Sequence, residues 1–380
     1  MKIETKLTHI GVGKDPHTGS ITTPIYQVAT FEHPCVGEST GYDYSRSANP
    51  TRKALEDGIK ELEEADAGFA FASGMAAVVA VLTLFKSGDH FVVTEDSYGG
   101  TYRVLNEIFA PFGFEVTFVD TSSTRDVRDA IRLNTKAILV ESPTNPLLKI
   151  ADIDAISSLA KERGILTVVD NTFMTPFLQK PLNLGADIVI HSASKYLGGH
   201  NDVVAGLVVT KGEKLSEKLY QIQNATGAIL GPQDCWLLIR GIKTLSLRME
   251  RQMENALSIA KWLEVNKLVK SVYYPGLSSS KGFELQSRQA KGYGAMLSFE
   301  MIDIDSTKEV INGVSLIKFA ESLGGVESLI TYPCTQTHAE LPEDFRNKLG
   351  ISDTLLRLSV GIEHIDDLIL DLKTAFDNIK

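Results

Sequence analysis

Cysteine is scarce in this chain. Cys35, Cys235 and Cys334 are the three cysteines among 380 residues, and they lie far apart in the sequence. Their spacing excludes a CxxC redox pair and a paired-cysteine zinc site, and it does not indicate a disulfide framework. We therefore expect a protein of a reducing compartment, the cytoplasm.

Recognition motifs for metals and dinucleotides are also missing. The eight histidines show no HExxH or other paired ligand spacing, so we predict that the protein binds no metal. His191 and His200 are interpreted as hydrogen-bonded structural groups. Neither GxGxxG nor a GxxxxGK phosphate loop occurs, which removes the main support for a dinucleotide site or a P-loop.

Clusters of positive charge and a secretory signal are absent too. The net charge is −10, from 38 Lys and Arg against 48 Asp and Glu, without a basic block. This distribution argues against partners such as nucleic acid or an anionic membrane surface. Residues 1–15 carry acidic side chains and no apolar run, so they are not typical of a secretory leader.

One uncharged stretch, residues 67–85, approaches the length of a membrane span. Its sequence is AGFAFASGMAAVVAVLTLF, in which Ser73-Gly74 is an interruption and small residues dominate. No Trp or Tyr belt flanks it. We interpret it as a buried strand followed by a buried helix.

The remaining patterns predict an α/β protein with two domains. Residues 1–45 lack periodicity and are expected to form an extended arm. Residues 46–235 alternate short β-branched runs with helical stretches, which predicts a large domain with a mostly parallel sheet covered by helices. Residues 236–380 are expected to form a smaller C-terminal α+β domain, with two helices around 307–321 and 365–379. The strand candidates of the large domain are HFVVTED, FEVTFVD, KAILVES, ILTVVDN, DIVIHSA and GLVVTKG.

Two charged residues follow neighbouring strand candidates, where ligands bind in open α/β sheets. Asp170 ends ILTVVD and Lys195 follows DIVIHSAS. A carboxylate beside a pyridine nitrogen keeps the ring protonated, and a lysine amine forms an imine with an aldehyde, so the pair suits a pyridine aldehyde cofactor. Taken singly, a turn-capping Asp170 and a solvated Lys195 are the favoured interpretations.

A phosphate group would need separate donors. The segment FASGMAAVVAVL predicts a strand, a turn at Gly74 and a helix start at Met75, where free backbone N–H groups face an anion. Ser192 and Ser194, close to Lys195, offer two more hydroxyl groups. A glycine before a helix is weak evidence by itself.

Two further residues suit a flat cofactor and an amino-acid substrate. Tyr98 follows a strand candidate, so its ring could stack on a cofactor and its hydroxyl could move protons. Arg357 lies in the apolar strand candidate LRLSVGI and needs an anion such as a substrate carboxylate. Ordinary packing of Tyr98 and a structural salt bridge of Arg357 are the alternatives.

Together these segments resemble the Cys/Met-metabolism family of pyridoxal-phosphate (PLP) enzymes, and the resemblance extends along essentially the whole chain. The matching segments, in order, are TTPIYQVATF, YDYSRSANPTR, FASGMAA, YGGTYR, ESPTNP, VVDNTF, HSASKYLGGH, LGGVESL and LRLSVGIE. The resemblance implies PLP fold type I, like aspartate aminotransferase. It also implies a cytoplasmic homotetramer of two dimers with shared active sites.

The resemblance also implies roles for individual residues. Lys195 would hold PLP as a Schiff base and act with Tyr98 in catalysis. The expected cofactor-binding residues are Tyr44 and Arg46 from a neighbouring subunit, and Gly74, Met75, Tyr98, Asp170, Ser192, Ser194 and Lys195 within the subunit. The expected substrate-binding residues are Asn145, Ser328, Arg357, Arg103 and Glu327.

The activity implied by this family is PLP-dependent chemistry at carbon–sulfur bonds of small amino acids. A cystathionine β- or γ-lyase ranks first, and a cystathionine γ-synthase or O-acetylhomoserine sulfhydrylase is the alternative. Gly100 stands where methionine γ-lyases typically have cysteine, which disfavours that member. An alternative from another class is a doubly wound binding protein or dehydrogenase without PLP, which would show the same alternation of strands and helices.

Overall fold

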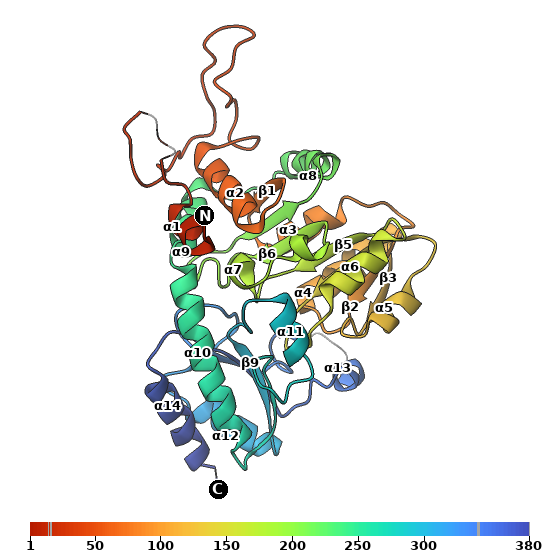
Figure 1. The fold of residues 1–380 in the computed structure, drawn as a ribbon, viewed down its shortest axis with the longest axis vertical. Coiled ribbons are helices and arrows are strands. Elements are labelled where there is room, and N and C mark those ends of the chain that lie inside the picture. The colour runs from red at the N-terminus through yellow and green to blue at the C-terminus, as the bar shows by residue number, and fades with distance from the viewer. Residues whose placement is uncertain (14, 16, 340–342, 380) are drawn as a thin grey trace.

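The computed structural model describes residues 1–13, 15, 17–339 and 343–379, and Figure 1 shows their arrangement. A seven-stranded sheet with the order β1-β7-β6-β5-β4-β2-β3 forms the centre of the large domain. The strands are β1 (Ala67–Phe71), β2 (His90–Thr94), β3 (Glu115–Val119), β4 (Thr135–Glu141), β5 (Leu166–Asp170), β6 (Ile188–Ser192) and β7 (Gly206–Thr210).

The five strands from β3 to β6 in this order pair in parallel, whereas β7 is antiparallel to both β6 and β1. The prediction of a mostly parallel sheet is therefore confirmed. The flanking helices are α2 (Pro50–Glu63), α3 (Gly74–Leu82), α4 (Gly99–Arg103), α5 (Thr124–Ala130), α6 (Ile153–Lys161), α7 (Thr175–Leu178) and α8 (Glu213–Thr226). The predicted strand and helix in residues 67–85 are confirmed as β1 and α3.

A smaller C-terminal unit packs below the large domain in Figure 1. Its mixed sheet has the order β10-β11-β12-β9-β8. The strands are β8 (Val269–Tyr273), β9 (Met296–Met301), β10 (Lys318–Phe319), β11 (Leu329–Thr331) and β12 (Leu355–Ser359), and the helices are α10 (Leu245–Glu264), α11 (Phe283–Gln289), α12 (Ile304–Gly313), α13 (Glu343–Leu349) and α14 (Ile365–Asp377).

The expected helix around 307–321 is only partly present. Helix α12 ends at Gly313, and the chain then forms the short edge strand β10. Gly313 packs closely on α14, since a Cβ atom added at this glycine would lie 2.9 Å from Ala375. The helix therefore ends where it meets its neighbour. Helix α4 continues into a π-helix at Val104–Phe109 and a 3-10 turn at Ala110–Phe112.

The N-terminal arm differs in part from the expected extended segment. Residues Ile3–His9 form helix α1, whose Ile3 and Leu7 side chains are buried in the main core. Periodicity over one short helix is too brief to recognise beside the irregular residues that follow. Most of the described chain between α1 and α2 lacks helix or strand and extends outward from the body (Figure 1).

Helix α9 (Pro232–Ile242) packs against α2 and spans the expected domain boundary at residue 235. The division into an arm (1–45), a PLP-binding domain and a substrate domain therefore stays a proposal, with the second boundary falling after α9. Among the described residues, the helices are too short or too polar to cross a membrane.

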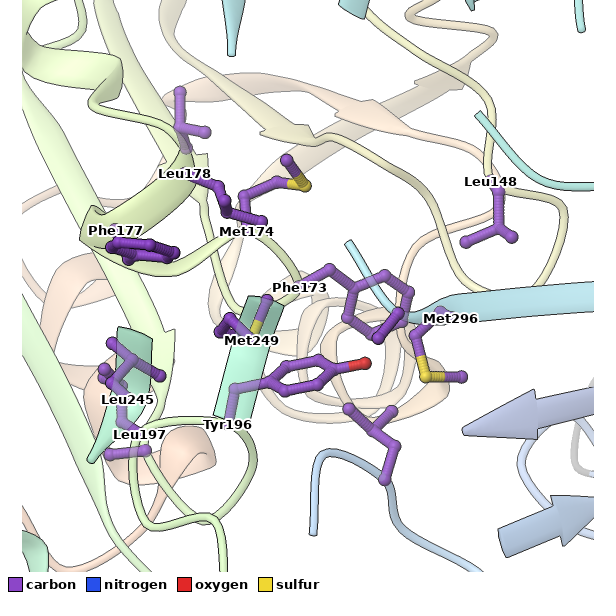
Figure 2. Packing of buried hydrophobic residues seen from close by; sticks show 14 of the residues in the cluster. Leu148, Phe173, Met174, Phe177, Leu178, Tyr196, Leu197, Leu245, Met249 and Met296 are labelled. Carbon is purple, nitrogen blue, oxygen red and sulfur yellow. The ribbon is translucent and has the colours of Figure 1, made fainter. Parts of the chain in front are cut away.

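The main hydrophobic core reaches the residue that directly follows Lys195. Tyr196 is fully buried, and Figure 2 shows its ring among Phe173, Met249 and Met296. These neighbours come from the loop after β5, from α10 and from β9. Packing from both domains therefore fixes the backbone that carries Lys195.

Candidate active site

The main cavity has a volume of about 810 Å³ and lies beyond the carboxyl ends of β4, β5 and β6. This is the position at which open α/β sheets bind ligands. Strand β12 and the loop before β11 form the opposite wall. The cavity brings together nine of the residues selected from the sequence, namely Gly74, Met75, Tyr98, Asn145, Asp170, Ser192, Ser194, Lys195 and Arg357.

Lys195 projects from the loop after β6 into this cavity. Its Nζ atom donates a hydrogen bond to Ser322 Oγ at 2.7 Å. Burial, together with the positive charge of Arg357, lowers the pKa of Lys195 from 10.5 to about 8, while Glu321 acts in the opposite direction. A larger fraction of this amine is therefore a neutral nucleophile near neutral pH than in an ordinary lysine.

Asp170 ends β5 in the floor of the cavity. Its Oδ1 atom accepts a hydrogen bond from the backbone N–H of Thr172 at 3.0 Å, which fixes the carboxyl group. Burial raises the pKa of Asp170, and hydrogen bonds from Thr172 lower it. A cationic ring nitrogen at this carboxyl would favour the ionised form.

The start of helix α3 forms a site suited to an anion. Ser73 caps the helix by accepting a hydrogen bond from Ala76 N at 3.0 Å, while Gly74 and Met75 line the cavity. A Cβ atom on Gly74 would lie 2.9 Å from Ser192 Oγ, so glycine permits the close approach of helix and strand. The free N–H groups of this helix end can bind a phosphate.

Ser194 takes part in an additional local contact. Its hydroxyl donates to Ala205 O at 3.3 Å and accepts from Ala205 N at 3.0 Å, which ties the lysine loop to the start of β7. The hydroxyl of Ser192 faces Gly74 instead. Of the two, Ser192 is the hydroxyl closer to the start of α3.

Tyr98 stands at the cavity mouth with 43% of its surface exposed. Its backbone N–H donates to Glu141 Oε2 at 2.9 Å, so the loop after β2 is tied to the end of β4. The aromatic ring is therefore available to a flat ligand that enters the cavity. Glu141 was not selected from the sequence, although it also lines the cavity.

Arg357, on β12, is only 1% exposed. Its guanidinium donates to Asn145 Oδ1 at 2.8 Å, to the backbone oxygen of Ser322 at 3.0 Å and to Thr331 Oγ1 at 3.1 Å. All three acceptors are neutral oxygens. The guanidinium can therefore attract the carboxylate of an amino acid in the cavity.

The triplet Glu-Ser-Leu occurs twice in this region, and the cavity lining includes the whole first copy but only Leu329 of the second. Glu321 and Ser322 line it, whereas Glu327 and Ser328 do not. The Ser328 hydroxyl donates to Glu363 Oε2 at 2.8 Å and accepts from Gly361 N at 2.9 Å.

Glu327 accepts a hydrogen bond from Asn201 Nδ2 at 2.8 Å and lies behind this cavity-lining residue. In contrast to the expectation from the sequence, Glu321 and Ser322, and not Glu327 and Ser328, line this cavity. A tertiary contact explains this placement. Gly324, with φ of 80°, presses against the Lys195–Tyr196 backbone, which brings the first triplet beside the lysine.

Three other selected residues lie outside the cavity lining. Tyr44 is 46% exposed on the arm, and Arg46 donates to the Asn224 backbone oxygen at 2.6 Å and lies over the Tyr44 ring. Arg103 lies on the exposed side at the end of α4. Tyr44 and Arg46 are both exposed on the surface of the chain.

The two histidines interpreted as structural have hydrogen-bond partners. His191 Nε2 lies 2.7 Å from Glu63 Oε1, and both side chains are fully buried. His200 Nδ1 lies 2.8 Å from Gly198 O. Within the described parts of the chain, no three His, Cys, Asp or Glu side chains are grouped to hold a metal.

These residues fit PLP. The glycine at the start of α3 leaves room for the phosphate, and Asp170 offers a carboxyl group to the ring nitrogen. Lys195 supplies an amine of lowered pKa to the aldehyde. The donors thus match three chemically different parts of one cofactor.

The comparison with protein-family models decides the family. The model for "Cys/Met metabolism PLP-dependent enzyme" matches residues 4–377. The chain belongs to this family. As a Cys/Met-metabolism PLP-dependent enzyme it uses pyridoxal 5′-phosphate, and the dehydrogenase or binding-protein alternative is wrong.

Several members of the family are similar over their full lengths. The chain is 54% identical to a cystathionine gamma-lyase of Bacillus subtilis, covering 100% of both sequences. It is 50% identical to a cystathionine beta-lyase of Lactococcus lactis, covering 99% of both. A crystal structure of cystathionine gamma-lyase from Lactobacillus plantarum complexed with L-serine matches with a TM-score of 0.98 and 48% identity, over 100% of this chain and 99% of that one. The expected PLP-enzyme fold is thus confirmed.

Proposed function

We propose that this family member cleaves the carbon–sulfur bond of cystathionine and related thioethers, as a cystathionine β- or γ-lyase. The observation that carries the proposal is the cavity itself. It combines the Lys195 amine and the Asp170 carboxyl with a guanidinium, Arg357, that is suited to a substrate carboxylate. Relatives named as γ-lyase and as β-lyase have similar identity to this chain. The carbon from which the thiolate leaves, β or γ, is therefore decided by local geometry.

When bound, PLP withdraws electrons from the substrate Cα and thereby makes its proton removable. Lys195 would hold the cofactor through its amine, and the same amine lies in the cavity where it can act as the base toward this proton. Its contact with Ser322 Oγ holds the amine on the Arg357 side of the cavity. Tyr98, at the mouth, covers the site and can move a second proton through its hydroxyl.

The substrate carboxylate is proposed to bind Arg357 and Asn145. These two side chains are already joined at 2.8 Å, so the anion site is formed before substrate arrives. Glu321 lines the same cavity and provides a negative charge for the distal ammonium group of cystathionine. This assigns the distal contact to Glu321 in place of Glu327, while Arg103 stays a proposed contact near the mouth.

The active enzyme is proposed to be a homotetramer of two dimers in which Tyr44 and Arg46 reach the cofactor phosphate of a neighbouring subunit. Their exposure on this subunit and their absence from its own cavity lining support this. The irregular arm that carries them extends from the body in Figure 1. An arm of this kind is stabilised by contact with another surface.

The first experiment is incubation of the purified yellow enzyme with cystathionine alone, followed by identification of the products. Pyruvate with homocysteine would establish a β-lyase, and 2-oxobutyrate with cysteine a γ-lyase. Lys195→Ala should abolish the visible absorbance of the Schiff base and turnover, whereas Lys211→Ala, at an exposed lysine, should change neither. A colourless protein that PLP cannot restore contradicts the proposal.

The second candidate is γ-replacement, as in a cystathionine γ-synthase or an O-acetylhomoserine sulfhydrylase. The cavity volume of about 810 Å³ favours it, because a second amino acid can enter beside the first. Formation of cystathionine from cysteine and an O-acylhomoserine, without keto acid from cystathionine alone, would establish this reaction.

A further inference from the structure

A second, smaller cavity lies directly beneath the floor of the active site. Its volume is about 30 Å³, and its polar lining consists of Ser97, Thr101, Glu141 and Asp170. Aliphatic side chains of α3, β2, β4, β5 and β6 complete its walls. Five residues line both cavities and separate the small one from the large one: Val78, Thr101, Glu141, Asp170 and Ile190.

The hydroxyl group of Ser97, which lines the small cavity, forms no hydrogen bond among the described residues. The residue is only 6% exposed, and its Oγ atom is buried without a hydrogen-bond partner among the described residues. Burying a hydroxyl without a partner is costly, and such groups in folded proteins usually bind an ordered water. A space of about 30 Å³ is larger than the roughly 10–15 Å³ that one water needs.

The two carboxyl groups beside this cavity are neighbours in the sheet. Glu141 of β4 pairs in register with Asp170 of β5, so both side chains leave the sheet on the same face, from strands about 4.8 Å apart. Asp96, also buried, adds a third carboxyl group nearby. The basic groups that act on these carboxyls are Arg357 of β12 at Glu141, Lys149 at Asp96 and His191 at Asp170. Two anions at this separation repel each other strongly in a buried site.

Glu141 is the more readily protonated member of the pair, since burial and the charge of Asp170 both raise its pKa well above the ordinary value. Its Oε2 atom is fixed by the Tyr98 N–H. Asp170 is held by the Thr172 N–H and faces the position proposed for the ring nitrogen, which favours its ionised form.

We propose that the small cavity is a built hydration site, in which a water bound to Ser97 Oγ bridges Glu141 and Asp170 and the bridged pair carries a single negative charge. Ser97 is then a positioning residue that acts on Asp170 through the water. The inference deepens the proposed function and rests on it, because Asp170 must face a cofactor for its charge to matter. Ser97 and Tyr98 are adjacent, so one loop supplies both the hydration site and the aromatic cover.

The test compares holoenzyme variants that change the cavity in opposite ways. Ser97→Ala removes the hydroxyl and keeps the space, whereas Ser97→Thr keeps the hydroxyl and fills the space with a methyl group. Ser157→Ala is the matched control, because Ser157 is likewise buried with an unpartnered hydroxyl but lies in α6, away from both cavities. The readouts are a high-resolution crystal structure, PLP affinity, and the pH titration of the visible absorbance of the bound cofactor.

We expect electron density for a water within hydrogen-bond distance of Ser97 Oγ in the parent enzyme and its loss in both Ser97 variants. Each should bind PLP about three- to tenfold more weakly, the effect of one hydrogen bond, and shift the midpoint of the absorbance titration. Ser157→Ala should match the parent in both measurements.

A parent structure without this water would overturn the inference. So would a Ser97→Thr enzyme with the parent's titration, which would show that the hydroxyl alone matters, or a Ser97→Ala enzyme that behaves like Ser157→Ala. These readouts need bound cofactor and no substrate. An enzyme that binds PLP yet leaves cystathionine intact would therefore contradict the proposed function and leave the hydration site to be judged separately.

Discussion

The amine of Lys195 lies 2.7 Å from the hydroxyl of Ser322, a residue whose backbone has a φ of 86°. A non-glycine residue in this left-handed region is strained. The strained backbone places the Ser322 hydroxyl on the lysine and its carbonyl oxygen on Arg357. One residue therefore orients both the proposed base and the proposed carboxylate site.

Replacing Ser322 separates these two contributions. Ser322→Ala and Ser322→Gly both lose the hydroxyl, so each should lower kcat by about 2- to 12-fold, the equivalent of one hydrogen bond. The glycine variant also relieves the strain and should be at least as stable to heat as the alanine variant. Steady-state kinetics and thermal unfolding of both proteins check this. Unchanged kcat in both would show that the contact does not orient the amine.

The lowered pKa of Lys195 predicts a pH dependence for cofactor uptake. Only the neutral amine attacks the aldehyde, and its fraction rises with pH through about 8, so the rate of PLP incorporation into apoenzyme should level off above that pH. An ordinary lysine would continue to gain reactivity up to its usual pKa of 10.5.

Two substitutions test the cause of this shift. Arg357→Gln removes a cation that lowers the pKa of Lys195, so the pH midpoint of PLP incorporation should move upward. Glu321→Gln removes an anion that raises this pKa, so the same midpoint should move downward. Stopped-flow absorbance of PLP incorporation measures both. Movement of the two midpoints in the same direction would contradict the assignment.

Arg357→Lys should weaken substrate binding although it keeps the charge. Lysine cannot donate simultaneously to Asn145 and Thr331 in the forked geometry of the guanidinium. The loss of a charge-assisted hydrogen bond predicts an increase in KM of about 10- to 150-fold. The affinity for the corresponding amine, which lacks the carboxylate, should change much less in the same variant.

The buried Glu63–His191 pair is expected to stabilise the floor of the large domain. Removing one member of a buried hydrogen-bonded pair costs about 3–5 kcal/mol, so Glu63→Ala should lower the free energy of unfolding by roughly that amount. The adjacent Glu64 pairs with Lys180 at the surface, and Glu64→Ala should cost about 1 kcal/mol or less. Urea titrations compare the two; equal losses would contradict the role of burial.

Shared active sites can be detected by mixing inactive subunits. Lys195→Ala and Arg46→Ala proteins should each have little activity alone. After dissociation and reassembly together, activity should return, because a hybrid dimer contains one site with Lys195 of one subunit and Arg46 of the other. A mixture that stays inactive, although hybrids form by mass spectrometry, would show that Arg46 acts within its own subunit or not at all.

The sequence predicted the large domain better than the arm or the small domain. Continuous β-branched runs such as HFVVTED mark buried parallel strands, and the residues after them can be placed at one sheet edge. The short strand β10 has only two residues, both exposed, so the sequence contains no apolar pattern that predicts it. Helix α1 is likewise too short for its periodicity to be recognised.

The candidate site shows the same limit. Asp170 and Lys195 follow strands and could be placed by chain order, whereas the repeated Glu-Ser-Leu triplets are chemically identical. The contact of Gly324 with the Lys195 backbone, which distinguishes Glu321 and Ser322 from the second copy, is a tertiary one. Glu141 was missed because its position beside Asp170 depends on strand order, which the sequence does not show directly.

Arg357 belongs to the small sheet, and its partner Asn145 belongs to a loop of the large domain. The receptor for the substrate carboxylate is therefore assembled where the small sheet meets the large domain, as two adjacent layers. A slight sliding of one layer over the other would separate guanidinium from amide while each layer keeps its own hydrogen bonds. On gentle heating, amino-acid binding should therefore be lost at a lower temperature than the helical structure.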